Sequence, residues 1–340
     1  MAGYRILHLS DTHLLADGGA HYGLVDTAAN LRRVLDRAAG VGALDLVIVT
    51  GDCSDDGSRD SYAALRGMVE PWAEQRGARA VFVMGNHDLP EGFTAELGDG
   101  AGGAAPVGPV DAVVRLGGLR LVVLDSTVAG AGYGRLDPGQ LARLRDELAV
   151  PAPDGTVVAL HHPPVPAATE LLQGLALQQP EALAEVLRGS DVRLVLAGHY
   201  HHPLVATLAG VPVVVSAAVT NLADVLGDPA VERATFSSGG TLVELDDREG
   251  CACCPSTCPC RARASRCSRS TGRRSLRSSR RPDRRRSARA TLVGPEATAA
   301  SALPRTHHQL GEPTAVVHQT SRCSAARWWL ISTVAGCSAR

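Results

Sequence analysis

Residues 194–203 read LVLAGHYHHP, in which a run of apolar residues ends in alanine and glycine and is followed by three histidines. A short, continuous run of branched apolar residues indicates a buried strand. His199 and His201 are two residues apart, so both side chains face the same side of an extended segment. Neutral imidazole is a common ligand of divalent transition metals. The stretch therefore predicts either a metal site at the end of a strand or histidines in a surface loop.

Similar strand-like runs recur through the first 250 residues, and several are separated by stretches with apolar residues at helical spacing. Strands are expected at 4–9, 45–50, 80–84, 119–124, 156–160, 193–197, 212–215 and 241–245. Helices are expected at 26–39, 61–76, 138–148 and 180–187. Buried strands that alternate with helices indicate an α/β protein, although the pattern leaves the number of sheets open. The Gly- and Ala-rich segment 92–109 is expected to be an irregular loop.

Most of these strands end in polar residues of the types that bind metals. They are Asp11, His13, Asp52, Asn86, His87, His161, His162, His199 and His201. In open α/β sheets, ligands bind beyond the carboxyl ends of the strands, so these loops can converge. Each residue taken alone also fits a turn. Five strand ends that all close in this way make coincidence a poor explanation.

The order of these blocks, D-x-H, GD, GNHD, HH and GHxH, resembles the calcineurin-like metallophosphoesterases over about residues 4–250. The stretches HLSDTHL, TGDCSDDG, RGMVEPWA, VMGNHD, PAPDGTVVALHHPP and LAGHYHH are similar to one branch, the bacterial class III cyclic-nucleotide phosphodiesterases. The resemblance implies an α/β fold built as a four-layer α/β/β/α sandwich, with two mixed sheets flanked by helices. It also implies a hydrolase that cleaves 3′,5′-cAMP or 2′,3′-cAMP.

The resemblance further implies a site that holds two metal ions. One ion would be held by Asp11, His13 and His201 and the other by Asn86, His161 and His199, with Asp52 bridging the two. Two cations roughly 3.5–4 Å apart can clamp a phosphate and share an activated water. The mixture of nitrogen and oxygen ligands suits Fe, Mn or Zn, as a divalent or mixed-valence pair.

His87 is the expected catalytic residue, because it is placed to donate a proton to the departing alkoxide or to stabilise its charge. Asn86 and His87 are both expected to contact the substrate, whereas His162 would be a neighbour of the site and not a ligand. A broad-specificity phosphodiesterase or phosphomonoesterase would use the same ligands. A metal-binding scaffold without catalysis is a further alternative, although a scaffold would have no use for His87.

Other residues near the motifs are expected to be structural. Within the first strand, His8 is interpreted as a core or supporting residue, and Cys53 as a small buried packing residue. Asp88 is expected to end the turn after His87, with orientation of His87 as the alternative; Asp125 is expected to belong to a turn, and His202 to lie at the surface. His21 and Tyr22 lie in a loop that could reach the substrate.

The formal net charge of −1 conceals two different kinds of sequence that join near Gly250. Residues 1–250 contain 17 Arg and 32 acidic residues, and residues 251–340 contain 17 Arg and 3 acidic residues. Eight of the nine cysteines also lie in the second part, and the chain has no lysine. Residues 1–250 are therefore expected to be the metallophosphoesterase catalytic domain. Residues 251–340 are expected to be an Arg/Cys-rich tail that is largely disordered, because it has little patterned apolar surface.

Three interpretations of this tail are open. Cys251 and Cys254 have the CxxC spacing of a zinc site, but no well-spaced second pair follows. An Arg-rich arm could bind nucleic acid or acidic lipid, and otherwise nucleic acid is not an expected partner. The preferred hypothesis is a shifted reading frame of GC-rich DNA.

The N-terminus MAGYRILHLS lacks the apolar region of a signal peptide, and no apolar stretch has the length of a membrane helix. A cytoplasmic location without membrane contact is therefore expected. The expected partner is a small-molecule phosphodiester or cyclic nucleotide, and a homodimer remains open.

Overall fold

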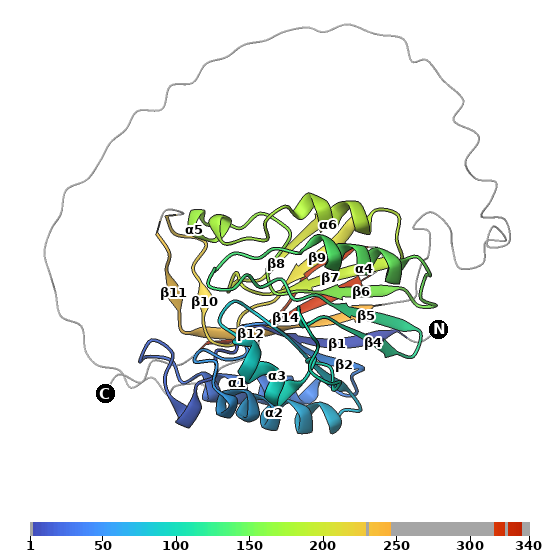
Figure 1. The fold of residues 1–340 in the computed structure, drawn as a ribbon. Coiled ribbons are helices and arrows are strands. Elements are labelled where there is room, and N and C mark those ends of the chain that lie inside the picture. The colour runs from blue at the N-terminus through green and yellow to red at the C-terminus, as the bar shows by residue number, and fades with distance from the viewer. Residues whose placement is uncertain (1–2, 229–230, 246–315, 324–325, 335–340) are drawn as a thin grey trace, which may run out of the picture. The chain divides into compact units, whose positions relative to one another are not determined.

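Two six-stranded sheets organise the part of the chain that the computed structural model describes, which is residues 3–228, 231–245, 316–323 and 326–334 (Figure 1). The first sheet has the order β13-β14-β12-β1-β2-β3, in which β1, β2 and β3 are parallel. Its strands are β1 (Tyr4–Leu9), β2 (Leu46–Thr50), β3 (Arg79–Val83), β12 (Ser237–Leu245), β13 (Val316–Cys323) and β14 (Ala326–Val334).

The second sheet has the order β4-β5-β6-β7-β9-β8. Its four central strands are parallel, and the two edge strands run antiparallel to their neighbours. The strands are β4 (Ala112–Leu116), β5 (Leu119–Val123), β6 (Thr156–Ala159), β7 (Val192–Ala197), β8 (Leu204–Leu208) and β9 (Val211–Val215). A separate two-stranded sheet is formed by β10 (Leu222–Ala223) and β11 (Ala234–Thr235).

Helices cover the outer face of each sheet (Figure 1). On the first sheet lie α1 (Thr27–Arg37), α2 (Arg59–Glu74) and α3 (Pro90–Leu97). On the second lie α4 (Pro138–Leu148) and α6 (Pro180–Leu187), while α5 (Glu170–Gly174) is a short helix further along the loop after β6. Two 3₁₀ turns, η1 (Ala16–Gly18) and η2 (Ala38–Val41), complete the helical elements. Side-chain caps fix the starts of several helices; the most complete is the capping box between Asp137 and Gln140 on α4.

Among the described residues, three of the four apolar clusters lie between the four layers. Along β1, Ile6 faces the core between the two sheets, and its neighbour Leu7 faces the core under α1 and α2. On the second sheet, Val157 and Val158 divide in the same way between the central core and the core under α4 and α6. Side chains alternate along a strand, so a strand that is apolar throughout serves two cores at once. This confirms the α/β/β/α sandwich.

All eight predicted strands and all four predicted helices are present, with shifts at their ends. The prediction of an irregular loop at 92–109 is wrong at its start, which belongs to α3. Pro90 lies in the first turn of this helix, and Phe93 and Leu97 are four residues apart and buried. The ring of Phe93 packs against Tyr62 at a centroid distance of 5.7 Å. The apolar pair outweighs the glycine content that suggested a loop.

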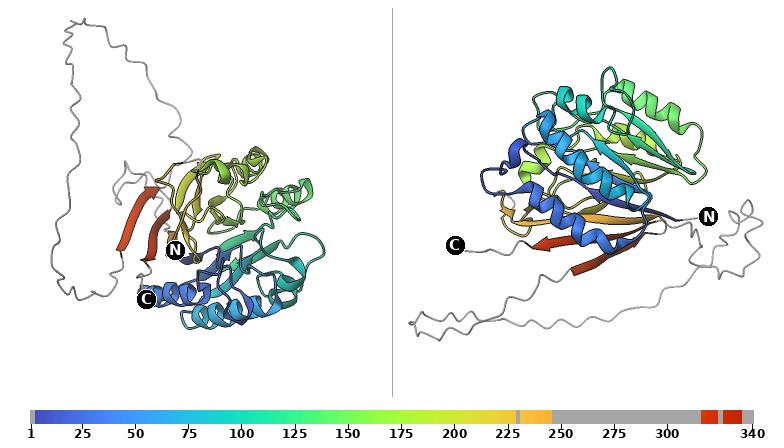
Figure 2. Two further views of the ribbon diagram at one scale, coloured as in Figure 1. Left: turned by 90° about the vertical axis from the view of Figure 1, so that its left-hand side faces the viewer. Right: turned by 90° about the horizontal axis from the view of Figure 1, so that it is seen from below.

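Two strands of the first sheet come from the region after Gly250, which the sequence pattern did not indicate. β14 pairs antiparallel with β12, and β13 pairs antiparallel with β14 (Figure 2). The other residues of this region, including Cys251 and Cys254, lie outside the described residues. For them, the zinc module, the Arg-rich arm and the disorder stay predictions.

Among the described residues, every helix is too short or too polar to span a lipid bilayer.

Candidate metal centre and active site

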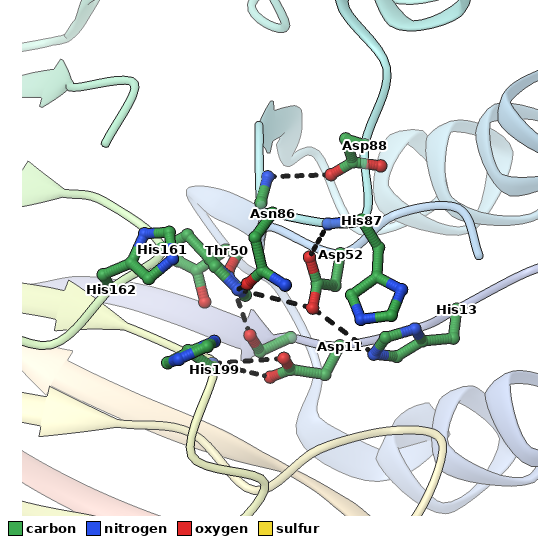
Figure 3. Close-up of polar contacts among 12 residues, drawn as sticks. Asp11, His13, Thr50, Asp52, Asn86, His87, Asp88, His161, His162 and His199 are labelled. Carbon is green, nitrogen blue, oxygen red and sulfur yellow. Dashed lines mark hydrogen bonds and ion pairs between the residues drawn. The ribbon is translucent and has the colours of Figure 1, made fainter. Parts of the chain in front are cut away.

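The candidate residues converge where the strands of both sheets end. Asp11 and His13 follow β1, Asp52 follows β2, and Asn86 and His87 follow β3, all in the first sheet. The second sheet contributes His161 after β6 and His199 and His201 after β7. Six of these eight line one pocket of about 240 Å³: His13, Asp52, Asn86, His87, His199 and His201. Asp11 and His161 are fully buried beside it (Figure 3).

The backbone at the strand ends is strained. Five of the candidate ligands have φ between 43° and 68°: Asp11, His13, Asp52, His199 and His201. This left-handed region is uncommon for residues other than glycine, although Asp and His enter it more readily than most. Such conformations persist only where the surroundings enforce them, and they cluster at functional sites. The sharp turns direct these side chains inward immediately after each strand.

Two motif glycines are required because the loops touch each other. A methyl group at Gly85, in GNHD, would collide with the backbone nitrogen and the carboxylate of Asp52. A methyl group at Gly198, in GHYH, would collide with the hydroxyl of Ser10. Glycine is the residue that permits such close backbone approach.

The first group of donors consists of Asp11, His13, Asp52 and His201, whose ligand atoms all lie within 4.8 Å of one another. Nε2 of His13 is 3.3 Å from Nε2 of His201 and 3.4 Å from Oδ2 of Asp52. Nε2 of His201 is 3.4 Å from Oδ1 of Asp11. Two imidazoles and two carboxylates therefore face one point.

The second group surrounds His161. Its Nε2 lies 3.1 Å from Oδ1 of Asn86 and 3.4 Å from Oδ2 of Asp52, the same oxygen that approaches His13. Ligand atoms of His161, His162 and His199 also lie within 4.8 Å of one another. One carboxylate oxygen of Asp52 therefore stands between the two groups (Figure 3).

Hydrogen bonds orient three of the imidazoles. Nδ1 of His13 lies 3.0 Å from Asp55, Nδ1 of His161 lies 2.7 Å from the Thr50 carbonyl, and Nε2 of His199 lies 3.0 Å from the Leu175 carbonyl. When a neutral ring donates from one nitrogen, the other presents a lone pair, as in metal-ligating histidines. Nε2 of His161 then faces the oxygens of Asn86 and Asp52, lone pair to lone pair. A proton on Nε2 removes this conflict in the metal-free protein, and a metal cation would take the place of that proton, so the donors fit a metal centre.

The pKa shifts show that positive charge stabilises the buried carboxylates of the site. Burial alone would lower the pKa of His161, but the carboxylate of Asp52 outweighs burial and raises this pKa to about 9. Burial would raise the pKa of Asp11, but His201 holds it at about 2. Burial and the neighbouring His161 lower the pKa of His199 to about 3. Buried carboxylates are stable only when they are paired or bind a metal.

The family model of calcineurin-like phosphoesterases matches residues 4–203, which contain all of these residues. The chain belongs to this family. Membership of this family implies a binuclear centre of divalent metals. The two donor groups joined by Asp52 offer candidate positions for its ions.

Two relatives are similar to this phosphoesterase over most of their length. A probable cyclic nucleotide phosphodiesterase of Rhodococcus erythropolis is 48% identical over 71% of this chain and 80% of the relative. A cAMP/cGMP dual specificity phosphodiesterase of Mycobacterium tuberculosis is 42% identical over 73% of this chain and 74% of the relative. Among solved structures, a purple acid phosphatase from yellow lupin matches with a TM-score of 0.51 and 14% identity, over 72% of this chain and 51% of that one. The last match shows the fold alone.

Asp55 is a functional candidate that the motifs did not reveal. Its carboxylate lies 3.0 Å from Nδ1 of His13, 3.0 Å from Nδ1 of His21 and 3.2 Å from Nδ1 of His87. The hydrogen bond to Asp55 raises the pKa of His87 above its ordinary value, although burial opposes it. In the sequence, Asp55 follows Asp52 by three residues in GDCSDDG, and this spacing matches none of the motif positions.

His162 lies within the candidate site, because its ligand atom is within 4.8 Å of those of His161 and His199. Its Nδ1 lies 2.9 Å from the hydroxyl of Ser126, and its Nε2 is buried without a hydrogen-bond partner among the described residues. The adjacent His161 was the stronger candidate on the family pattern, and nothing in the local sequence distinguishes their roles.

Most of the residues interpreted as structural are so. His8 is buried and contacts the hydroxyl of Thr50 at 2.8 Å, and Cys53 is buried in the core under α1 and α2. The Asp88 carboxylate accepts hydrogen bonds from the backbone of Gly85, Cys53 and Ser54, which ties the GNHD turn to the loop after β2. Asp125 accepts bonds from Thr127, as a turn residue does. The expectation for His202 is wrong, because it is buried and stacks on Tyr200.

Proposed function

We propose that this protein is a metal-dependent phosphodiesterase that hydrolyses cyclic nucleotides, either 3′,5′-cAMP or 2′,3′-cAMP. The observation that carries the proposal is the position of Asp52, whose Oδ2 lies 3.4 Å from Nε2 of both His13 and His161. A carboxylate can bridge two cations. The names of the two relatives above support a cyclic nucleotide as the substrate.

The metals would be held as the family resemblance implies. Asp11, His13 and His201 would hold one ion, Asn86, His161 and His199 the other, and Asp52 both. When bound, the pair supplies charge neutralisation for the phosphodiester and lowers the pKa of a water that attacks phosphorus. Fe, Mn or Zn, as a divalent or mixed-valence pair, suits this mixture of nitrogen and oxygen donors.

His87 is the residue that we assign to the leaving group. Its backbone N–H donates to Oδ1 of Asp52 at 2.9 Å, and its Nδ1 is held by Asp55, so the other ring nitrogen is directed to the pocket. The side chain is 38% exposed and can therefore reach a bound substrate. It would donate a proton to the departing ribose oxygen, or stabilise the charge that develops there.

Asn86 serves both the metal centre and the substrate in this proposal. Its Oδ1 faces His161 at 3.1 Å, and its amide N–H groups can donate to a phosphate oxygen. Asn86 and His87 follow β3 consecutively, so one turn places an amide and an imidazole beside the same phosphate.

The test is a comparison of substrates with the purified full chain loaded with Mn²⁺. We expect turnover of a cyclic nucleotide with kcat/KM at least about tenfold above that for bis(p-nitrophenyl) phosphate and for p-nitrophenyl phosphate, a difference of about 1.4 kcal/mol in transition-state stabilisation. Equal rates on all of them would favour a broad-specificity phosphoesterase. Bound metal without turnover of any phosphate ester would favour a binding scaffold.

A further inference from the structure

Tyr22 is displayed at the mouth of the active-site pocket. It lines the same pocket as Asn86 and His87, yet its side chain is 82% exposed. Its φ of 52° is a rare conformation for a bulky residue. The turn is closed by hydrogen bonds between the backbones of His21 and Val25, and the Tyr22 ring contacts the His21 ring at 4.1 Å. The fold thus keeps the Tyr22 ring exposed to solvent beside the active-site pocket.

Helix α5 and Leu175, which follows it, contribute an apolar surface to the same pocket; their leucines are called the α5 leucines below. Leu171, Leu172 and Leu175 line it, and Leu171 is 54% exposed. Two contacts fix this surface: the Thr169 hydroxyl donates to Glu232 at 2.9 Å, and the Leu175 carbonyl lies 3.0 Å from Nε2 of His199. The second contact fixes the leucines relative to His199, which is a proposed metal ligand.

The two surfaces come from different sheets. Tyr22 lies in the loop after β1 of the first sheet. Helix α5 lies in the long connection after β6 of the second sheet (Figure 1). Asn86 and His87 contribute to the pocket that these surfaces share. Tyr22 and the leucines line the same pocket, so atoms attached to a phosphate at these two residues can reach them.

We propose that Tyr22 and the α5 leucines form a slot for the nucleobase of the substrate. The inference rests on the proposed function, because it assumes that the group attached to the phosphate is a nucleoside. Aromatic side chains stack on bases through their faces with little dependence on sequence, because every base has a π-face. The leucines cover the base with apolar surface. Exposed Leu24 in the same loop does not line the pocket, which makes it a matched control.

The experiment compares 3′,5′-cAMP with a base-free analogue, 1-O-methylribose 3′,5′-cyclic phosphate, on the Mn²⁺-loaded full chain. Tyr22→Ala is expected to raise KM for 3′,5′-cAMP about tenfold and to leave KM for the base-free analogue unchanged. Tyr22→Phe keeps the ring and is expected to behave as wild type. Leu171→Ala is expected to change KM in the same direction as Tyr22→Ala, and Leu24→Ala is expected to change nothing.

The outcomes separate the slot from the function. If wild type hydrolyses both compounds with equal KM, the base makes no contact and the slot is wrong while the phosphodiesterase stands. If Tyr22→Ala impairs both compounds equally, Tyr22 supports the loop and not the base, which also overturns the slot. If wild type hydrolyses neither compound nor 2′,3′-cAMP but cleaves bis(p-nitrophenyl) phosphate, the proposed cyclic-nucleotide function fails, and the slot fails with it.

Discussion

Nδ1 of His87 lies 3.2 Å from Oδ1 of Asp55, and Nδ1 of His13 lies 3.0 Å from the same oxygen. One carboxylate thereby links the proposed proton donor to a proposed metal ligand. His21 contacts the other oxygen of Asp55 at 3.0 Å. Asp55 thus sets the position of His87 relative to the proposed metal ligands, although Asp55 is neither a proposed ligand nor the proposed proton donor.

Asp55→Asn is expected to weaken metal binding by about tenfold and to lower turnover as well. Partners of metal-ligating histidines typically contribute factors of this size, because they fix the ring and raise its basicity. Titration of the metal-free protein with Mn²⁺, followed by activity at saturating metal, measures the two effects separately. Asp60→Asn in the exposed first turn of α2 is the control. Unchanged metal affinity in Asp55→Asn would show that the carboxylate does not support His13.

His87→Ala is expected to keep both metals and to lose about 10²- to 10⁴-fold in kcat, the usual contribution of general acid catalysis. The loss should be smaller for a substrate whose leaving group needs no proton, such as bis(p-nitrophenyl) phosphate. Metal content by mass spectrometry and kcat on both substrates test this. An equal loss on both would argue that His87 binds the phosphate and does not donate a proton.

Asp52→Ala is expected to lose metal and activity together, because its carboxylate stands between the two donor groups. Metal analysis after gel filtration, with a thermal melt to verify folding, is the measurement. Asp60→Asn in the exposed first turn of α2 is a matched control and should retain both metals. A folded Asp52→Ala protein that retains two metals would disprove the bridging role.

Asp191→Ala is expected to lower the free energy of unfolding by about 3 kcal/mol without changing metal content. Arg120 is a charged side chain with 1% exposure, and Asp191 accepts two hydrogen bonds from its guanidinium at 3.0 and 3.1 Å. Removing Asp191 takes one of two carboxylates away from a buried guanidinium and leaves only Glu147, at 3.2 Å, to balance its charge. Urea unfolding tests this, with Arg143→Ala as control. Arg143 forms an exposed ion pair with Asp111, so its loss should cost less than about 1 kcal/mol. Equal effects of the two substitutions would contradict the argument.

The hypothesis of a shifted reading frame after residue 250 stays a prediction. Sequencing the gene across the codons for residues 245–255 decides it, because a single intact frame would remove the hypothesis. The pairing of β14 with β12 makes the question structural as well, since β12 is central to the first sheet.

The sequence by itself determined the central strands, four helices and the candidate ligands. Strand and helix patterns are local, and a strand such as β1, with apolar residues on both faces, can be recognised without knowledge of its neighbours. The ligand types follow the strands directly, so their convergence could be expected from the rule that sites form at the carboxyl ends of strands. Even so, the number of sheets followed only from the family resemblance.

Only the tertiary structure decided which other side chains reach the site. Asp55 carries no pattern of its own, and it reaches the site because the loops that bear it, His13 and His87 approach one another. His162 stands in the HH block and Tyr22 in a loop that could reach the substrate, but their contacts at the site appear only in the folded chain. The edge strands β4 and β8 and the strands β13 and β14 also escaped prediction. These strands are stabilised by hydrogen bonds to a neighbouring strand and have a weak pattern of their own. The pairing of β14 with β12 joins residues far apart in the chain. A local pattern indicates which side chains of a segment are buried, whereas contacts between distant segments exist only in the folded chain.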